Sequence, residues 1–337
     1  MRNSTDSHYA PRGRFVLALG GLACLLLGTA TAAQTETDAR SSDWQVSLVG
    51  GGVKQFETSI DSGGDFQIDN FFFRAGASRN FGNAWNTGIS LEYGEDRYKF
   101  SGNSGFGGMD PWGTIRNIKV SVPIRYRKDN NWTFVGVPSL RYSGERGASL
   151  SDSQLWGFFA GAAYRFSDRL TIGPGFGVFT DIEDANSVFP ILLIDWKISD
   201  TLSLKTGAGL EASRGPGVLL NWAPAQQWSF GLGTRYEQNR FRLDDTGPAP
   251  DGVGENRSVP VAISAKYMPS RDFELTLLGG MEFAGRLRLE DARGNRLSDS
   301  DYDTAPFVGA FARTRFQPAP DCGGVMGLQR RSLRPQS

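Results

Sequence analysis

The chain has 337 residues, 39% of them hydrophobic, and its 36 basic and 36 acidic side chains balance. This composition excludes a bundle of transmembrane helices, which would need repeated apolar runs of about 20 residues. The 43 glycines and 23 phenylalanines favour strands, where aromatic residues are enriched and glycine lets neighbouring backbones approach closely. We therefore expect an all-β chain.

The N-terminus has the three parts of a secretory signal. Three arginines precede an apolar run that starts at Phe15 and ends in the small residues 30–32, which is the order that a cleaved signal peptide requires. We expect residues 1–32 to be removed and residues 33–42 to form a short periplasmic segment before the first strand.

Removal of this signal changes the chemical inventory. It takes three arginines and one aspartate, which leaves 33 basic and 35 acidic residues, and it takes His8 and Cys24. The slightly acidic balance excludes a nucleic-acid-binding protein. Because His8 is the only histidine, the mature chain has no histidine, and Cys322 alone cannot form an internal disulfide.

From residue 43 the chain divides into about 14 segments (12 to 16) in which every second residue is apolar, the pattern of half-buried strands. They begin at Trp44, Phe71, Trp85, Ile118, Trp132, Trp156, Leu170, Val188, Leu202, Val218, Trp228, Val259, Phe273 and Pro306.

The connections between these segments alternate in length. Tight turns are expected at 82–84, 127–131, 167–169, 199–201, 223–227 and 268–272. Between them lie longer polar links, of which 94–113, 238–257 and 286–304 are rich in Gly, Asp and Ser. Short turns at one end and long loops at the other are typical of outer-membrane barrels, and a soluble sandwich has no reason for this asymmetry.

Aromatic residues flank almost every tight turn, among them Phe81 and Trp85, and Trp222 and Trp228. Aromatic rings at one depth form the girdle where acyl chains meet headgroups, although aromatics also begin strands in soluble β proteins. In Ala162–Phe179 the apolar positions alternate with Ala, Arg, Thr and Gly. A closed barrel would turn the apolar face to lipid and enclose the other face.

On these features the sequence resembles the Gram-negative outer-membrane β-barrel class, porin-like and of a family without a known function. The resemblance implies a transmembrane, antiparallel, up-and-down barrel over residues 43–316 in the cell outer membrane. It also implies contact with outer-membrane lipid and lipopolysaccharide, and a last strand whose Phe316 is the signal for the barrel-assembly machinery. Residues 317–337 continue past that aromatic, and we expect them to be a disordered extension.

Strand parity selects the residues that would line the lumen. If Leu, Ile and Trp face lipid, charged side chains of both signs face inward, as in a water-filled pore; alternatively, they pair with one another and plug the barrel. The expected pore-lining set is Arg74, Glu92, Lys119, Arg125, Arg141, Arg165, Lys205, Glu211, Arg235, Glu237, Lys266, Glu282 and Arg313, and the inward face also includes Lys197, Glu274 and Arg315.

We expect a passive or weakly selective diffusion channel for small hydrophilic solutes, monomeric and with a weak preference for anions. The alternatives are a non-conducting structural or surface-interaction barrel and a transporter of hydrophobic compounds. The long links lack an evident aromatic cluster, which argues against dedicated adhesion.

We expect no catalytic residues, cofactor or metal. The barrel enzymes that resemble this class use a histidine as general base, and the mature chain has none. Asp299, Asp301 and Asp303 have the spacing of a calcium loop but lack its glycine and distant glutamate, so they are expected to form a solvated loop.

Overall fold

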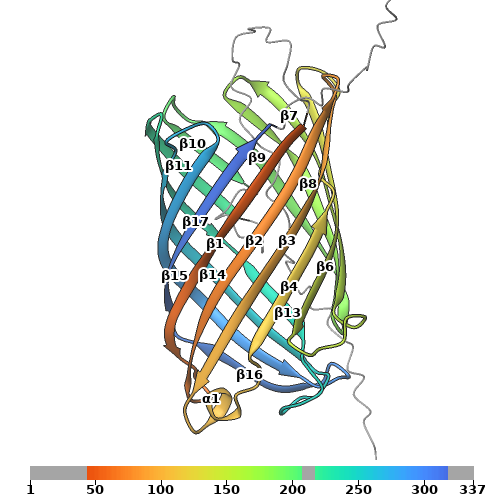
Figure 1. Ribbon diagram of the computed structural model, residues 1–337, viewed down its shortest axis with the longest axis vertical. Coiled ribbons are helices and arrows are strands. Elements are labelled where there is room, and N and C mark those ends of the chain that lie inside the picture. The colour runs from red at the N-terminus through yellow and green to blue at the C-terminus, as the bar shows by residue number, and fades with distance from the viewer. Residues whose placement is uncertain (1–43, 207–216, 318–337) are drawn as a thin grey trace, which may run out of the picture.

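The computed structural model describes residues 44–206 and 217–317, except for the side chains of 184–187. It is a closed antiparallel β-barrel, drawn in Figure 1 with its long axis vertical. Its strands are β1 (Trp44–Ser59), β2 (Asp65–Phe81), β3 (Trp85–Ser101), β4 (Thr114–Ser121), β5 (Ile124–Arg127), β6 (Trp132–Glu145), β7 (Gln154–Ser167), β8 (Leu170–Asp181), β9 (Asp184–Lys197), β10 (Leu202–Thr206), β11 (Gly217–Ala225), β12 (Trp228–Arg235), β13 (Glu237–Arg242), β14 (Val253–Tyr267), β15 (Phe273–Glu290), β16 (Arg296–Tyr302) and β17 (Ala305–Phe316).

Three wall strands are interrupted, so these segments make a barrel of fourteen strands. β4 and β5 both pair with β3 and β6, β12 and β13 both pair with β14, and β16 and β17 both pair with β15. The ring closes where β1 pairs with β17, from Val46 opposite Phe316 to Gln55 opposite Phe307. The predicted fold class is confirmed.

The outer surface of the barrel is apolar in a broad band. Alternate residues of the strands expose large hydrophobic side chains, including Ile89, Leu91, Phe158, Phe176, Leu192, Leu232, Ile263, Leu277 and Val308. In the segment Ala162–Phe179, Phe166 and Phe176 are exposed. The apolar face of these strands therefore points outward, as a lipid-facing surface requires.

An aromatic girdle borders this band at the end with the tight turns. Rings on adjacent strands contact one another: Trp85 lies 4.5 Å from Tyr126, and Trp132 lies 5.0 Å from Tyr164, between ring centroids. On the other side of the barrel, Trp228 lies 4.8 Å from Tyr267. The rings that flank separate turns in the sequence thus share one level of the structure.

The strands extend further toward the other end than their alternation indicates. The link predicted at 286–304 is mostly strand, because β15 continues to Glu290 and β16 occupies Arg296–Tyr302. Parts of 94–113 and 238–257 are likewise strand, in β3, β13 and β14. In these extensions the outer face carries polar residues and the inner face carries apolar ones such as Tyr98, Leu287 and Leu289. This is the reverse of the pattern within the apolar band, so the segments do not resemble membrane-crossing strands although the backbone ladder continues.

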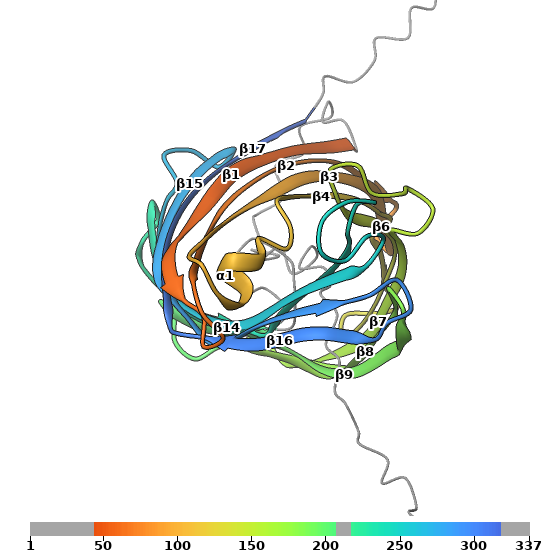
Figure 2. The ribbon, with the colours of Figure 1, turned by 90° about the horizontal axis from the view of Figure 1, so that it is seen from below.

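The helix of the described residues is the short α1 (Gly105–Met109). No helix in the described part of the chain is long and apolar enough to cross a membrane. Seen from the end with the long links, α1 lies inside the ring of strands (Figure 2). The link that carries it therefore folds into the mouth of the barrel.

Candidate functional site

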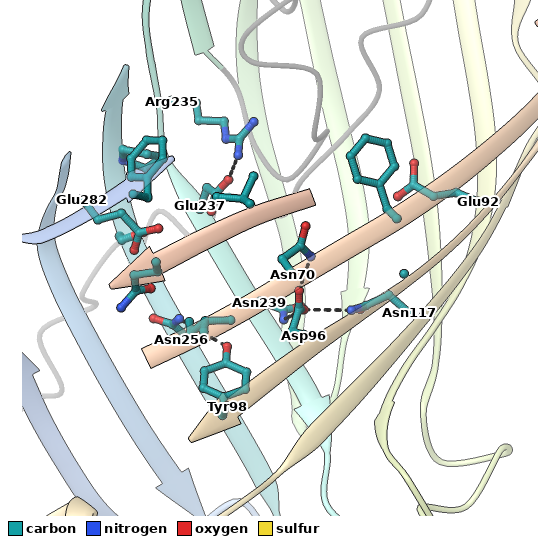
Figure 3. A pocket seen from close by; sticks show the side chains of 18 of the residues that line it. Asn70, Glu92, Asp96, Tyr98, Asn117, Arg235, Glu237, Asn239, Asn256 and Glu282 are labelled. Atoms are coloured by element: carbon teal, nitrogen blue, oxygen red, sulfur yellow. Dashed lines mark hydrogen bonds and ion pairs between the residues drawn. The ribbon is translucent and has the colours of Figure 1, made fainter. Parts of the chain in front are cut away.

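The middle of the lumen contains a polar network centred on Asp96. Its carboxylate is 1% exposed and accepts hydrogen bonds from the side-chain amides of Asn70, Asn117 (3.0 Å) and Asn239 (3.3 Å). These residues come from β2, β3, β4 and β13, and Figure 3 shows them converging. A buried carboxylate needs such donors, because desolvation of an unpaired charge is costly.

Arg141 extends the network across the lumen. Its guanidinium donates to Asn117 Oδ1 (3.1 Å), Ser143 Oγ (3.2 Å) and the side chain of Asn239. Asn239 can take part because β13 leaves the wall: Arg242 at its end forms a parallel bridge with Gly144 of β6. Strands that are not neighbours in the wall are thus joined through the lumen.

Beside this network lies a chamber of about 110 Å³. It is lined by both polar and apolar side chains, and Figure 3 shows labelled polar residues that converge on it from several strands. The polar lining includes Glu92, Asp96, Asn117, Lys119, Arg141, Arg235, Glu237, Asn239, Asn256 and Glu282, and the apolar lining includes Val53, Ile68, Phe72, Leu278, Phe307 and Phe311. The chamber is large enough for a few water molecules or a small solute.

Six of the predicted pore-lining residues line this chamber, namely Glu92, Lys119, Arg141, Arg235, Glu237 and Glu282. Arg74 lies next to them and forms an ion pair with Glu92, and Arg235 forms one with Glu237. Both pairs join residues on the same stretch of wall rather than charges facing each other across an open lumen.

The other predicted residues lie toward the end with the tight turns. Lys266 and Arg313 both contact Glu274, at 3.3 and 3.1 Å, and Arg315 lies 3.8 Å from the same carboxylate. Lys205 lies 3.5 Å from Asp195 on the neighbouring strand. Glu211 lies outside the described residues.

Arg125, Arg165 and Lys197 differ from this group. Arg125 is half-buried, and its Nε has no hydrogen-bond partner in the described structure. Arg165 and Lys197 are exposed, and no ion pair joins any of the three to a carboxylate of the described residues. The structure thus places them on the strands as expected, and whether they or the other residues line a conducting path stays a prediction.

A hydrophobic plug fills the mouth at the end with the long links. It consists of Ile60, Phe66, Ile68, Tyr98, Phe106, Trp112, Ile115, Phe241, Leu243, Ala249, Leu287, Leu289, Tyr302 and Ala305, all buried. The ring of Trp112 lies 5.8 Å from that of Phe106 and 5.3 Å from that of Phe241. The interpretation that the long links lack an aromatic cluster is therefore wrong.

Two arginines of β13 fasten this plug to the barrel rim. Arg240 is 4% exposed and contacts Glu255 at 2.7 Å, Glu290 at 2.8 Å and Asp181 at 3.3 Å. It also donates to the carbonyl of Ile182 at 2.8 Å. Arg242 contacts Glu183 at 2.6 Å. The tip of the β8–β9 hairpin is thereby tied to β13, β14 and β15.

The apolar groups inside the lumen were missed by the sequence analysis. Phe72 lies between two outward phenylalanines in the run 71–73, and it packs inside with Val49, Leu278, Phe307 and Phe311. Strand parity relative to Arg74 could have placed it inward, because residues two apart share a face. Phe159 similarly packs inward with Val137.

Asp299, one of three aspartates with calcium-loop spacing, is held by arginines. It forms ion pairs with Arg286, Arg288 and Arg296. In the described part of the chain no group of three or more His, Cys, Asp or Glu side chains could hold a metal ion.

Comparisons with known proteins assign no family to the chain. No family model matches it, and no curated protein matches it. An outer membrane channel from Pseudomonas putida F1 is 10% identical, with a TM-score of 0.45 over 84% of this chain and 100% of that one.

Two further solved structures are similar at the same level. A FadL homologue of Pseudomonas aeruginosa is 13% identical, with a TM-score of 0.43 over 81% of this chain and 89% of that one. The KdgM porin is 9% identical, with a TM-score of 0.37 over 80% and 99%. Their descriptions name an outer membrane channel, a FadL homologue and a porin. At these TM-scores the likenesses identify neither a solute nor a mechanism.

Proposed function

We propose that the chain is an outer-membrane channel for small hydrophilic solutes, with its long-link end outside the cell and its mouth closed by the plug in the described conformation. The observation that carries this proposal is the polar chamber inside a barrel whose outer surface is apolar. A barrel that served only as a membrane anchor would have no need of inward charges, since each costs desolvation energy unless it is paired.

The strand number supports this proposal. Eight-stranded barrels are filled by side chains, and barrels of 16 to 18 strands leave an aqueous channel. Fourteen strands lie between these limits. The inward side chains and the plug reduce the free space to a chamber of about 110 Å³. Conduction therefore requires the plug to move, and the solutes that pass are small.

We also propose a preference for anions, set at the end with the tight turns. Arg125, Arg165 and Lys197 add positive charge there without an ion pair to the described carboxylates. In the same region Glu274 is shared by three basic residues. Low-dielectric walls focus such a field and raise the local concentration of counter-ions.

Reversal-potential measurements in a planar bilayer under a KCl gradient test both parts of the proposal. We expect discrete current steps and a reversal potential that is shifted from zero toward the equilibrium potential of chloride. The triple change Arg125→Gln, Arg165→Gln and Lys197→Gln should move this potential toward that of a non-selective pore. A correctly folded protein that passes no current, even after the plug is weakened, would refute the channel and favour a structural barrel.

The apolar part of the chamber lining favours a second candidate, a transporter of small hydrophobic or amphipathic compounds. Phe72, Leu278, Phe307 and Phe311 pack together and form a contiguous apolar part of the lining. Uptake of benzoate and of toluene into proteoliposomes separates the two candidates. A hydrophilic channel passes benzoate and chloride and gives the aromatic ring of benzoate no advantage. A hydrophobic transporter accelerates the entry of toluene, and the change Phe307→Ser should slow that entry.

A further inference from the structure

A row of basic side chains crosses the outside of the barrel, next to the apolar band on the side of the long links. We call it the outer basic belt, and it consists of Lys54, Arg97, Lys99, Arg116 and Arg146. Arg97 and Lys99 share the outer face of β3 with the exposed Ile89 and Leu91, because residues two apart on a strand face the same side. The belt is therefore on the lipid-facing surface and not in the lumen.

The strand register places these residues side by side. Lys54 is opposite Asp69, Asp69 is opposite Arg97, and Arg97 is opposite Thr114. The backbone N–H of Arg146 donates to the carbonyl of Thr114 at 2.9 Å. With strands about 4.8 Å apart, this row covers roughly 20 Å of the circumference.

Two carboxylates lie within the belt and leave it with an excess of positive charge. Asp69 contacts Lys54 and Lys99, both at 2.9 Å. Glu95 contacts Arg97 at 3.0 Å, Arg116 at 3.6 Å and Arg146 at 3.9 Å. Five basic groups thus share two acidic ones.

The basic groups remain accessible although they contact these carboxylates. The side chains of Lys54, Lys99 and Arg146 are 43%, 58% and 62% exposed, whereas those of Asp69 and Glu95 are 35% and 6% exposed. The cations are thus more exposed than the carboxylates that anchor them, and they can contact a second anion from the outside.

The apolar surface begins immediately next to the belt, on the side of the tight turns. Phe71 is opposite Glu95, two residue pairs from the pair Asp69–Arg97 of the row, and the guanidinium of Arg97 lies 5.1 Å from the centre of its ring. Phe71, Phe73 and Ile118 are all exposed on this side. A lipid whose acyl chains cover these side chains carries its headgroup at the level of the belt.

We infer that the outer basic belt binds the phosphate groups of a phosphorylated lipid of the outer leaflet. Apolar contact positions the acyl chains, and the exposed ammonium and guanidinium groups supply charge-assisted hydrogen bonds to phosphate oxygens. Juxtamembrane basic residues bind anionic lipid surfaces by the same attraction. This inference does not depend on conduction through the lumen.

A titration followed by native mass spectrometry tests the inference. The folded protein in neutral detergent is titrated with diphosphoryl lipid A, with lipid A from which both phosphates have been removed, and with inorganic phosphate. We expect the wild type to retain diphosphoryl lipid A and to retain the dephosphorylated form far more weakly. Inorganic phosphate at the same concentration should not compete.

Matched variants locate the site. The triple change Lys54→Gln, Lys99→Gln and Arg146→Gln leaves Arg97 and Arg116 to neutralise Glu95. It should weaken binding of diphosphoryl lipid A by roughly 100-fold, since each basic group near an anionic surface contributes about fivefold. A control triple at the tight turns, Lys128→Gln, Arg169→Gln and Arg271→Gln, removes the same charge and should leave binding unchanged.

The variants Lys54→Arg and Lys99→Arg keep the charge and should bind as the wild type does. Equal binding by the wild type and the belt triple would overturn the inference, and so would equal retention of both forms of lipid A. Competition by inorganic phosphate would assign the belt to a soluble phosphate ion and would overturn the lipid as its ligand.

Discussion

The change Arg240→Ala should release the plug and raise the open probability of the channel. Arg240 is 4% exposed, and its guanidinium contacts Asp181, Glu255 and Glu290 and donates to the carbonyl of Ile182. Removal of one partner from a buried ionic cluster costs about 3–5 kcal/mol, because the buried carboxylates lose the cation that they share. If these contacts exist in the closed state alone, the open population increases by a factor of roughly 10² to 4 × 10³, at 1.4 kcal/mol for each factor of ten.

Single-channel recording in a planar bilayer measures this change directly. We expect rare, brief openings for the wild type and long openings of the same unit conductance for Arg240→Ala. The matched control is Arg286→Ala, which removes an arginine paired with Asp299 on the adjacent wall strand and should leave the open probability unchanged. A shift of the protein's gel mobility on boiling verifies that each variant is folded. Equal open probabilities for folded Arg240→Ala and the wild type would refute the assignment of Arg240 as a fastening of the plug.

Three further outcomes are expected. The carboxyl of Glu145 accepts backbone N–H groups of Gly113 and Asp244 at the mouth, and burial raises its pKa above the ordinary value of 4.5. The closed state therefore binds the proton more tightly, so the closed state loses stability as the pH rises above 4.5. The open probability should increase with pH in this window, and Glu145→Gln should abolish the pH dependence. Leu91→Arg places a charge within the lipid-facing band and should lower the free energy of unfolding in vesicles by about 2–4 kcal/mol. Ser101→Arg lies on the same face of β3 beyond the band and should lower this free energy by less than half as much. Equal losses for the two variants would contradict the position of the band. Phe241→Ala empties a fully buried position in the plug and should cost about 3–5 kcal/mol. This loss should be seen as faster hydrogen exchange in residues 243–252, with β1 unaffected, and unchanged exchange would contradict the packing role of Phe241.

The wall of the barrel could be predicted from the sequence because lipid imposes a regular constraint. Alternate residues must be apolar where a strand crosses the band, so all fourteen strands were visible, and aromatic rings such as Trp85 and Trp228 fixed the level of the tight turns. Beyond the band this constraint ends. In the extensions of β3 and β15 the outer face becomes polar and the inner face apolar, so the pattern of the band is reversed although the backbones remain paired.

The plug could not be predicted from the sequence because it is formed by contacts between distant segments. Phe106, Trp112, Phe241 and Tyr302 come from three different links and are isolated aromatics in the sequence. The inward turn of β13, which brings Arg240 to the tip of the β8–β9 hairpin, likewise leaves no local pattern. Charge parity predicts an inward position for Glu92, Lys119 and Arg141, and all three line the chamber, but their partners became known from the structure.

The most direct test of the central claim asks whether ions pass through the chamber. Ser258 lines the chamber, whereas Ile263 on the same strand is 68% exposed on the outer surface. In the mature Arg240→Ala protein, with Cys322 replaced by Ser, each position is changed to Cys and treated with a charged, bulky methanethiosulfonate. We expect the reagent to reduce the single-channel current of Ser258→Cys and to leave that of Ile263→Cys unchanged. Complete labelling of Ser258→Cys with no change in current would contradict a conducting path through the chamber.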